Sequence, residues 1–273
     1  RTSRPFGPHP AGTRRICPPM PSNGLHDAPH RATPFSWWRE QIRQRHGRAV
    51  YVHRPLGSNM FILVHGAYHG GWCWQPLIGH LQTLGHQAIA PDLPGHAFTD
   101  GWIGQQDLPA YIEAIAGALD EAETPPVLVG HSMSGAVVAG AAELRPDKIR
   151  KLVFLAAYIP ADGENLGELV QSDPDSHAQA VRFDVGGVSA ITPKTSAIRD
   201  AFYNDATEPQ QAWVEDRIQL QAARVCRGDR AISFGHQRWM AERAGCDPII
   251  EMDTGHSPFL TATEALADIL IGL

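Results

Sequence analysis

The feature that most constrains this chain is a serine between a short apolar run and a run of small residues, VLVGHSMSGA over 127–136. The branched apolar residues favour a buried strand, and the small residues after the serine favour a helix that packs close to it. A glycine-flanked turn between the two would expose the Ser132 hydroxyl at the edge of a sheet, where a base can reach it. The run therefore predicts a nucleophile elbow with Ser132 at its tip.

One position departs from the usual spacing of such a turn. The pattern GxSxG would place its last glycine at 134. This chain has Ser134 there, followed by Gly135. Because serine is nearly as small as glycine, we expect the strand and the helix still to approach each other closely.

Two segments further along supply the partners that a serine hydroxyl needs to become a nucleophile. An apolar run followed by a Gly-His loop, IIEMDTGHSPF over 249–259, places His256 beyond a strand end. Its imidazole can act there as general base and then as general acid. The run RVCRGD over 224–229 ends in Asp229, whose carboxylate can orient that imidazole. The three residues follow the chain order Ser, Asp, His that this kind of turn requires.

A fourth segment lies upstream, FILVHGAYHGGW over 61–72, in which an apolar strand ends in His-Gly. Glycine lets the backbone approach a substrate closely. The backbone N–H of Ala67 can then pair with that of Met133 as an oxyanion hole, which needs no side chain.

Predicted strands and helices alternate along residues 60–273, which is typical of an α/β fold with a mostly parallel twisted sheet and helices on both faces. Strands are expected at 61–65, 87–91, 126–130, 151–157, 222–227 and 248–252, and helices at 72–85, 106–121, 132–144, 234–244 and 261–271. Residues 161–221 interrupt the alternation, and we expect them to form a mostly helical cap. The motif loops then gather at the carboxyl ends of the strands, where open α/β sheets bind ligands.

Taken together, these segments resemble the α/β-hydrolase fold, and within it the branch of plant methyl esterases, hydroxynitrile lyases and bacterial carboxylesterase and pyrethroid hydrolase relatives. The resemblance rests on HGAYHGGWCW (65–74), PDLPGH (91–96), GHSMSG (130–135), CRGDRAI (226–232), QRWMAERAG (237–245) and GHSPFL (255–260). It implies a catalytic triad of Ser132, His256 and Asp229, with Ala67 and Met133 as oxyanion donors. Because some members of this fold carry the acid after a different strand, Asp162 is the alternative acid.

The same resemblance separates two reactions. The lyase members carry a threonine where Gly66 stands and, directly after the histidine, a lysine where Ser257 stands. Release of cyanide needs that cation, so the resemblance favours a serine carboxylesterase that hydrolyses a small to bulky apolar ester through an acyl-enzyme. A hydroxynitrile lyase-like enzyme and a non-catalytic ligand receptor on the same fold are the alternatives.

The composition fits a globular enzyme that works without a cofactor or metal. Hydrophobic residues make up 43% of the 273 residues, enough for a substantial core. The net charge of −6 favours neither nucleic acid nor an anionic membrane as a partner. The four cysteines and 14 histidines show no metal-ligand spacing. We therefore expect free thiols, a cytoplasmic location and a small-molecule ester as the partner, with a homodimer as a possible assembly.

Residues 1–59 differ from the rest of the chain, since they hold 10 of the 23 Lys and Arg residues but only 2 of the 29 Asp and Glu residues. Such a Pro/Arg-rich extension cannot form a core by itself, so we expect residues 1–35 to be disordered. Residues 37–46 and 49–53 could add a short helix and an extra edge strand. No apolar run follows the paired arginines at 14 and 15, so the sequence predicts no signal peptide, and we expect the hydrolase domain to start at Met60.

Overall fold

The computed structural model describes residues 57–96, 106–164, 166–175, 180–185, 188–193, 198–219, 221–222 and 232–273. The predictions made for residues 1–56 lie outside this part of the chain, and so does Asp229.

Among the described residues, four parallel strands form the central sheet. In spatial order they are β2 (Gln87–Ile89), β1 (Met60–Val64), β3 (Val127–His131) and β4 (Lys151–Leu155). Leu63 of β1 lies opposite Val129 of β3, and Val129 in turn lies opposite Val153 of β4. β3 is buried along its whole length, as expected for a continuous apolar strand covered on both faces. The strands predicted at 61–65, 87–91, 126–130 and 151–157 are thus confirmed.

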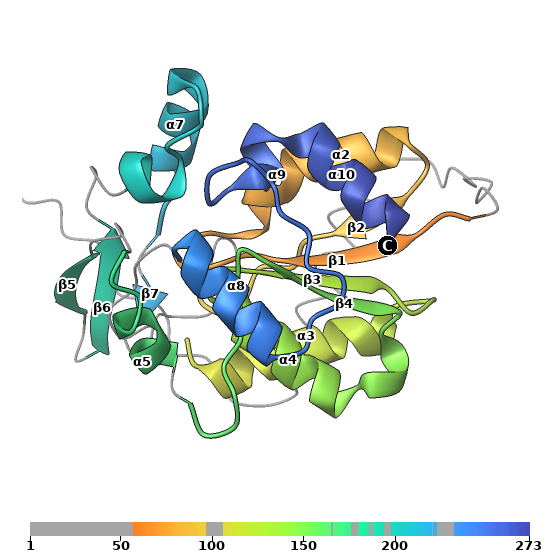
Figure 1. Ribbon diagram of the computed structural model, residues 1–273, viewed down its shortest axis with the longest axis horizontal. Coiled ribbons are helices and arrows are strands. Elements are labelled where there is room, and N and C mark those ends of the chain that lie inside the picture. The colour runs from red at the N-terminus through yellow and green to blue at the C-terminus, as the bar shows by residue number, and fades with distance from the viewer. Residues whose placement is uncertain are drawn as a thin grey trace, which may run out of the picture. The chain divides into compact units, whose positions relative to one another are not determined.

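Helices cover both faces of this sheet (Figure 1). α2 (Gln75–Thr83) and α10 (Thr263–Gly272) lie together on one face, and α3 (Leu108–Glu121) and α4 (Ser134–Leu144) lie on the other. The start of α3 is set by Asp107, whose carboxylate accepts a hydrogen bond from the N–H of Ala110 at 2.9 Å. Other helical segments outside the cap are η1 (Gly71–Trp74), η3 (Pro146–Lys148), α8 (Phe234–Arg243) and α9 (Pro258–Thr261). The predicted α/β layering is therefore confirmed.

The predicted cap contains the expected helical segments and, in addition, a small antiparallel sheet. Its elements are α5 (Leu166–Gln171), β5 (Ala180–Val185), β6 (Val188–Pro193), the π-helical turn η4 (Ile198–Phe202), α7 (Glu208–Glu215) and β7 (Gln221–Ala222). The strand order is β5-β6-β7, and Val185 pairs with Val188. Two glycines separate these valines in the sequence, a hairpin signal that the sequence analysis missed.

The strand predicted at 248–252 is wrong, because the structure describes this segment as irregular backbone. A strand persists only where a neighbouring backbone pairs with it. Of the neighbour predicted at 222–227, residue 222 ends β7, and the remainder lies outside the described residues. Within the described chain, β4 accordingly pairs with β3 alone.

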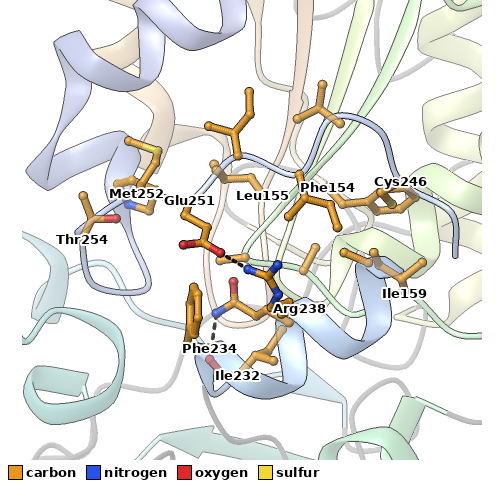
Figure 2. Close-up of a pocket in the computed structure, with 18 of the residues that line it drawn as sticks. Phe154, Leu155, Ile159, Ile232, Phe234, Arg238, Cys246, Glu251, Met252 and Thr254 are labelled. Atoms are coloured by element: carbon orange, nitrogen blue, oxygen red, sulfur yellow. Dashed lines mark hydrogen bonds and ion pairs between the residues drawn. The ribbon is translucent and has the colours of Figure 1, made fainter. Parts of the chain in front are cut away.

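A cavity of about 640 Å³ lies between β4 and the irregular segment. Figure 2 shows Phe154 and Leu155 of β4 at this cavity, together with an ion pair between Arg238 of α8 and Glu251.

None of the described helices combines the length and the apolar character that a bilayer crossing requires. Among the described residues, Cys73 and Cys246 are free thiols.

Candidate active site

Ser132 lies at the end of β3 in a backbone conformation that few residues other than glycine adopt. Its φ is +55°, in the left-handed region. The N–H of Ser132 lies 3.3 Å from the carbonyl oxygen of Leu155 and 3.2 Å from that of Ala156, and its own carbonyl accepts from the N–H of Tyr158 at 3.0 Å. Strain of this kind persists only where the surroundings hold it, and it gathers at functional sites.

The usual turn has a glycine at position 134. In this chain Ser134 and Gly135 each take over part of the role of that glycine. The hydroxyl of Ser134 donates a short hydrogen bond to the backbone carbonyl of His65 at the end of β1. A Cβ on Gly135 would collide with the carbonyl oxygen of Tyr158. Helix α4 can therefore approach the segment after β4 this closely only because residue 135 is glycine, whereas residue 134 contributes a hydrogen bond through its hydroxyl. Sequence reasoning foresaw the close approach but not this bond.

The loop after β1 packs directly against Ser132. A Cβ on Gly66 would lie 2.9 Å from the Ser132 Cβ and 3.0 Å from Nδ1 of His131. Ala67 follows Gly66 and is buried, and Met133 is the N-cap residue of α4. The first N–H groups of a helix have no partner within it, so this end of α4 offers donors beside the serine.

His256 lies in the same buried neighbourhood. Its carbonyl oxygen accepts from Nε2 of His131 at 2.9 Å, and the two rings lie 4.6 Å apart. The ring of Phe202, from η4 in the cap, packs edge-on against it at 5.6 Å. Because His131 directly precedes Ser132, these contacts bring the predicted base next to the predicted nucleophile.

The His256 ring has no hydrogen-bond partner within the described residues, although both nitrogens are buried. Burial of an unpaired ring N–H costs about 1–3 kcal/mol, so a partner is expected for each nitrogen. Asp162, the alternative acid, is exposed, and no hydrogen bond joins it to His256. Asp229 lies outside the described residues.

Asp205 holds the loop that carries His256, and the sequence analysis missed it. The Asp205 carboxylate accepts from the N–H of Gly255 at 2.6 Å and from the Thr261 hydroxyl at 2.9 Å. A Cβ on Gly255 would collide with Asn204 and Asp205. Asp205 lies about fifty positions away in the chain, and no local pattern marks such a contact.

Burial lowers the pKa of every histidine around the site. The pKa of His256 falls from 6.5 to about 3 and that of His69 to about 4, chiefly because burial penalises the charged imidazolium. The pKa values of His65 and His131 are also lowered for the same reason. All four imidazoles are therefore neutral near pH 7, the form in which a histidine can accept a proton. Within the described part of the chain, no cluster of three His, Cys, Asp or Glu residues could hold a metal ion.

The chain belongs to the alpha/beta hydrolase family, whose sequence pattern matches residues 61–269. It is 36% identical over 125 residues to a carbendazim-hydrolysing esterase from Nocardioides, a match that covers 44% of this chain and 52% of that protein. The chain thus spans about half the length of that relative. It is 27% identical over 251 residues to methylesterase 2 of Arabidopsis thaliana, covering 78% of this chain and 95% of that protein.

A solved structure gives the same fold. The crystal structure of a pyrethroid hydrolase from Sphingobium faniae matches with a TM-score of 0.63 at 25% identity, covering 79% of this chain and 96% of that one. The fold and the family predicted from the sequence are thus confirmed.

The buried histidines predict a loss of stability in mild acid. Between about pH 6.5 and pH 4, His69 takes up a proton in the unfolded chain but not in the folded one, so the free energy of unfolding falls as the pH falls. At about 1.36 kcal/mol for each pKa unit, His69 alone contributes a loss of about 2–3 kcal/mol by pH 4.5. Urea unfolding near pH 7 and near pH 4.5 measures this loss. The variant His69→Asn should lose less, and an equal loss in both proteins would contradict the prediction.

The close approach at Gly135 predicts that even one methyl group is harmful there. Because a backbone oxygen cannot move aside, Gly135→Ala should lower the free energy of unfolding by about 1–3 kcal/mol and kcat/KM at least about tenfold. The control is Gly79→Ala in α2, where a Cβ would meet nothing within 4 Å. That variant should stay active and gain about 0.5–1 kcal/mol. A Gly135→Ala protein of ordinary stability and activity would refute the packing argument.

Proposed function

We propose that this protein is a serine carboxylesterase. The Ser132 hydroxyl attacks the ester carbonyl carbon while His256 takes its proton, and the resulting oxyanion accepts hydrogen bonds from the N–H groups of Ala67 and Met133. Collapse of this intermediate breaks the bond to the alcohol, which leaves with the proton from His256. Water, deprotonated by His256, then cleaves the acyl-enzyme and releases the carboxylic acid. Asp229 orients the imidazole and stabilises its charged form.

The single observation that carries this proposal is the strained Ser132 backbone between two loops. A φ of +55° at a serine costs free energy, and a serine that served only to pack would have no reason to adopt this strained conformation. The Gly66 loop packs directly against the Ser132 Cβ, since a Cβ on Gly66 would lie 2.9 Å from it. The neutral, buried His256 supplies the base, since its ring packs on the neighbour of the nucleophile.

The two ring nitrogens of His256 are buried and have no hydrogen-bond partner among the described residues. This supports a catalytic carboxylate that lies outside the described residues. Nδ1 of a triad histidine donates to a carboxylate, yet no described group accepts from it. Asp229 is the acid that the chain order Ser, Asp, His predicts, and it lies outside the described residues.

The cap favours an apolar ester. The Phe202 ring packs against both His256 and Tyr68, at 5.6 and 6.1 Å, so a cap residue supplies apolar surface beside the base. Leu169 and Val170 of α5 are also buried. Such a lining binds an uncharged ester by removing apolar surface from water.

The lyase alternative finds less support in the same geometry. Gly66 has no side chain where lyases carry a hydroxyl, and any Cβ there would crowd Ser132. Ser257 stands where lyases carry a lysine, so the site offers no cation to cyanide at that position. A cyanohydrin assay that follows cyanide release separates a lyase from an esterase, and rapid multiple turnover on small esters separates an enzyme from a ligand receptor.

Replacement of the nucleophile tests the proposal directly. Ser132→Ala should lower the kcat for hydrolysis of a p-nitrophenyl ester by at least about 10³-fold, because the members of a triad act as one unit. The matched control is Ser172→Ala on the exposed surface of the cap, which should keep its activity. Near-normal turnover by Ser132→Ala would rule out the assignment.

The identity of the acid is tested by a pair of conservative variants. Asp229→Asn should lower kcat by about 10³–10⁴-fold, because an amide favours the wrong histidine tautomer. Asp162→Asn should change kcat less than about threefold, since Asp162 is exposed. If only the second variant loses activity, Asp162 is the acid and Asp229 is not.

A further inference from the structure

The loop after β1, residues 65–69, carries Ala67 and is called the oxyanion loop here. The cap contacts this loop through a buried hydrogen-bonded pair, His69 and Tyr203. Nε2 of His69 lies 2.5 Å from the Tyr203 hydroxyl, and Nδ1 lies 2.6 Å from the carbonyl oxygen of Ala67. Tyr203 follows η4 in the cap and is wholly buried, and His69 is 2% exposed. His69 also stacks on Trp72, whose ring meets that of Trp213 in α7 at 5.1 Å. The cap therefore touches the oxyanion loop through a polar pair with aromatic packing beside it.

The direction of each hydrogen bond follows from its partners. The Ala67 carbonyl can only accept, so Nδ1 of His69 carries the proton and donates it. Nε2 is then an acceptor, and the Tyr203 hydroxyl donates to it. Burial lowers the pKa of His69 to about 4, so the ring is neutral near pH 7 and carries a single proton, on Nδ1. Burial raises the pKa of Tyr203, so its hydroxyl stays protonated and can donate.

Three successive carbonyl groups of the loop are held in this way. Nδ1 of His65 donates to the Gly66 carbonyl at 2.9 Å, since its Nε2 accepts from the N–H of Leu93. His69 holds the Ala67 carbonyl, and the N–H of Gln219 donates to the Tyr68 carbonyl at 2.9 Å. Gln219, like Tyr203, belongs to the cap.

These contacts bracket the backbone N–H of Ala67. The Gly66 carbonyl and the Ala67 N–H share one planar peptide, so His65 sets the direction of the N–H through that plane. The next peptide is turned by His69, and the residue after it, Tyr68, has a φ of +67°. A non-glycine residue in that region must be held there by its surroundings. The cap contributes two of the hydrogen bonds that hold this conformation, one from Tyr203 to His69 and one from the N–H of Gln219 to the Tyr68 carbonyl.

We propose that Tyr203 and His69 form a positioning relay, in which the cap residue Tyr203 orients His69, and His69 holds the Ala67 carbonyl in the peptide that follows the Ala67 N–H. The relay thereby fixes the backbone at Ala67 for stabilisation of the oxyanion. Neither side chain touches the reacting atoms. This inference rests on the proposed esterase function, because it assigns a task to the oxyanion hole of that reaction. It makes the docked cap a condition for full transition-state stabilisation, in addition to any part the cap has in binding substrate.

Three variants separate the two ends of the relay. His69→Asn places an amide N–H where Nδ1 stands, so the bond to the Ala67 carbonyl can persist while the link to Tyr203 is lost. His69→Gln reaches toward Tyr203 but gives up the bond to Ala67. Tyr203→Phe removes the hydroxyl that bonds His69 and that also interacts with Ser257. The control is Tyr111→Phe in α3, another buried tyrosine that lies near a histidine, His96.

The readout is steady-state hydrolysis of a p-nitrophenyl ester, together with inhibition by an aryl trifluoromethyl ketone. This ketone forms a tetrahedral oxyanion adduct with a serine nucleophile, so its Ki reports on the oxyanion hole. The loss of one oxyanion donor costs about 10²–10³-fold in kcat. We expect His69→Gln to approach that loss, Tyr203→Phe to lose about tenfold and His69→Asn to lose least. The Ki for the ketone should rise in parallel, with KM changed less than about threefold and Tyr111→Phe unaffected.

A purely structural role gives a different pattern. In that case all three variants would lose apparent kcat only in proportion to the folded fraction measured by urea unfolding, and KM and Ki would stay unchanged. That result, or full kcat and unchanged Ki in His69→Gln and Tyr203→Phe while Ser132→Ala is inactive, overturns the relay alone. Full activity of Ser132→Ala overturns the proposed function and the relay with it.

Discussion

The left-handed turn at Ser132 is the constraint on which the rest of the site depends. It persists because backbone groups of Leu155, Ala156 and Tyr158, at the end of β4, hold both the N–H and the carbonyl of the serine. Helix α4 can lie close enough for these bonds only because residue 135 has no side chain. A parallel sheet and a strained serine are therefore parts of one arrangement, in which the packing of β3, β4 and α4 compensates the cost of the turn.

Around this turn, the cap does more than cover the site. Asp205 holds the loop of His256, the proposed base, through the Gly255 N–H, and Tyr203 bonds to His69 in the loop after β1. Both lie just after η4, so one short stretch of the cap reaches the loops on two sides of Ser132, the proposed nucleophile. Burial keeps the histidines there neutral, which is the form that the proposed base needs and the form in which His69 donates to a carbonyl.

Sequence reasoning succeeded where structure depends on local pattern. The apolar runs predicted β1 and β3, and the glycine-flanked serine predicted the turn between β3 and α4, because these features arise within a few residues. It went wrong at 248–252, where a strand needs a neighbour that pairs with it. It also could not predict Ser134 bonding to His65 or Asp205 bonding to Gly255, because those partners are brought together only by folding.

The amino-acid sequence by itself determined the family, the layered α/β fold and the candidate nucleophile and base, since periodicity and short motifs encode these locally. Only the tertiary structure decided which peptide groups are held in place and by which side chains. Hydrogen bonds such as that between His69 and Tyr203 join residues 134 positions apart, and their geometry depends on how the cap packs. No pattern within a short stretch of chain can specify a contact of that kind, because both partners are common residues whose pairing is selected by burial.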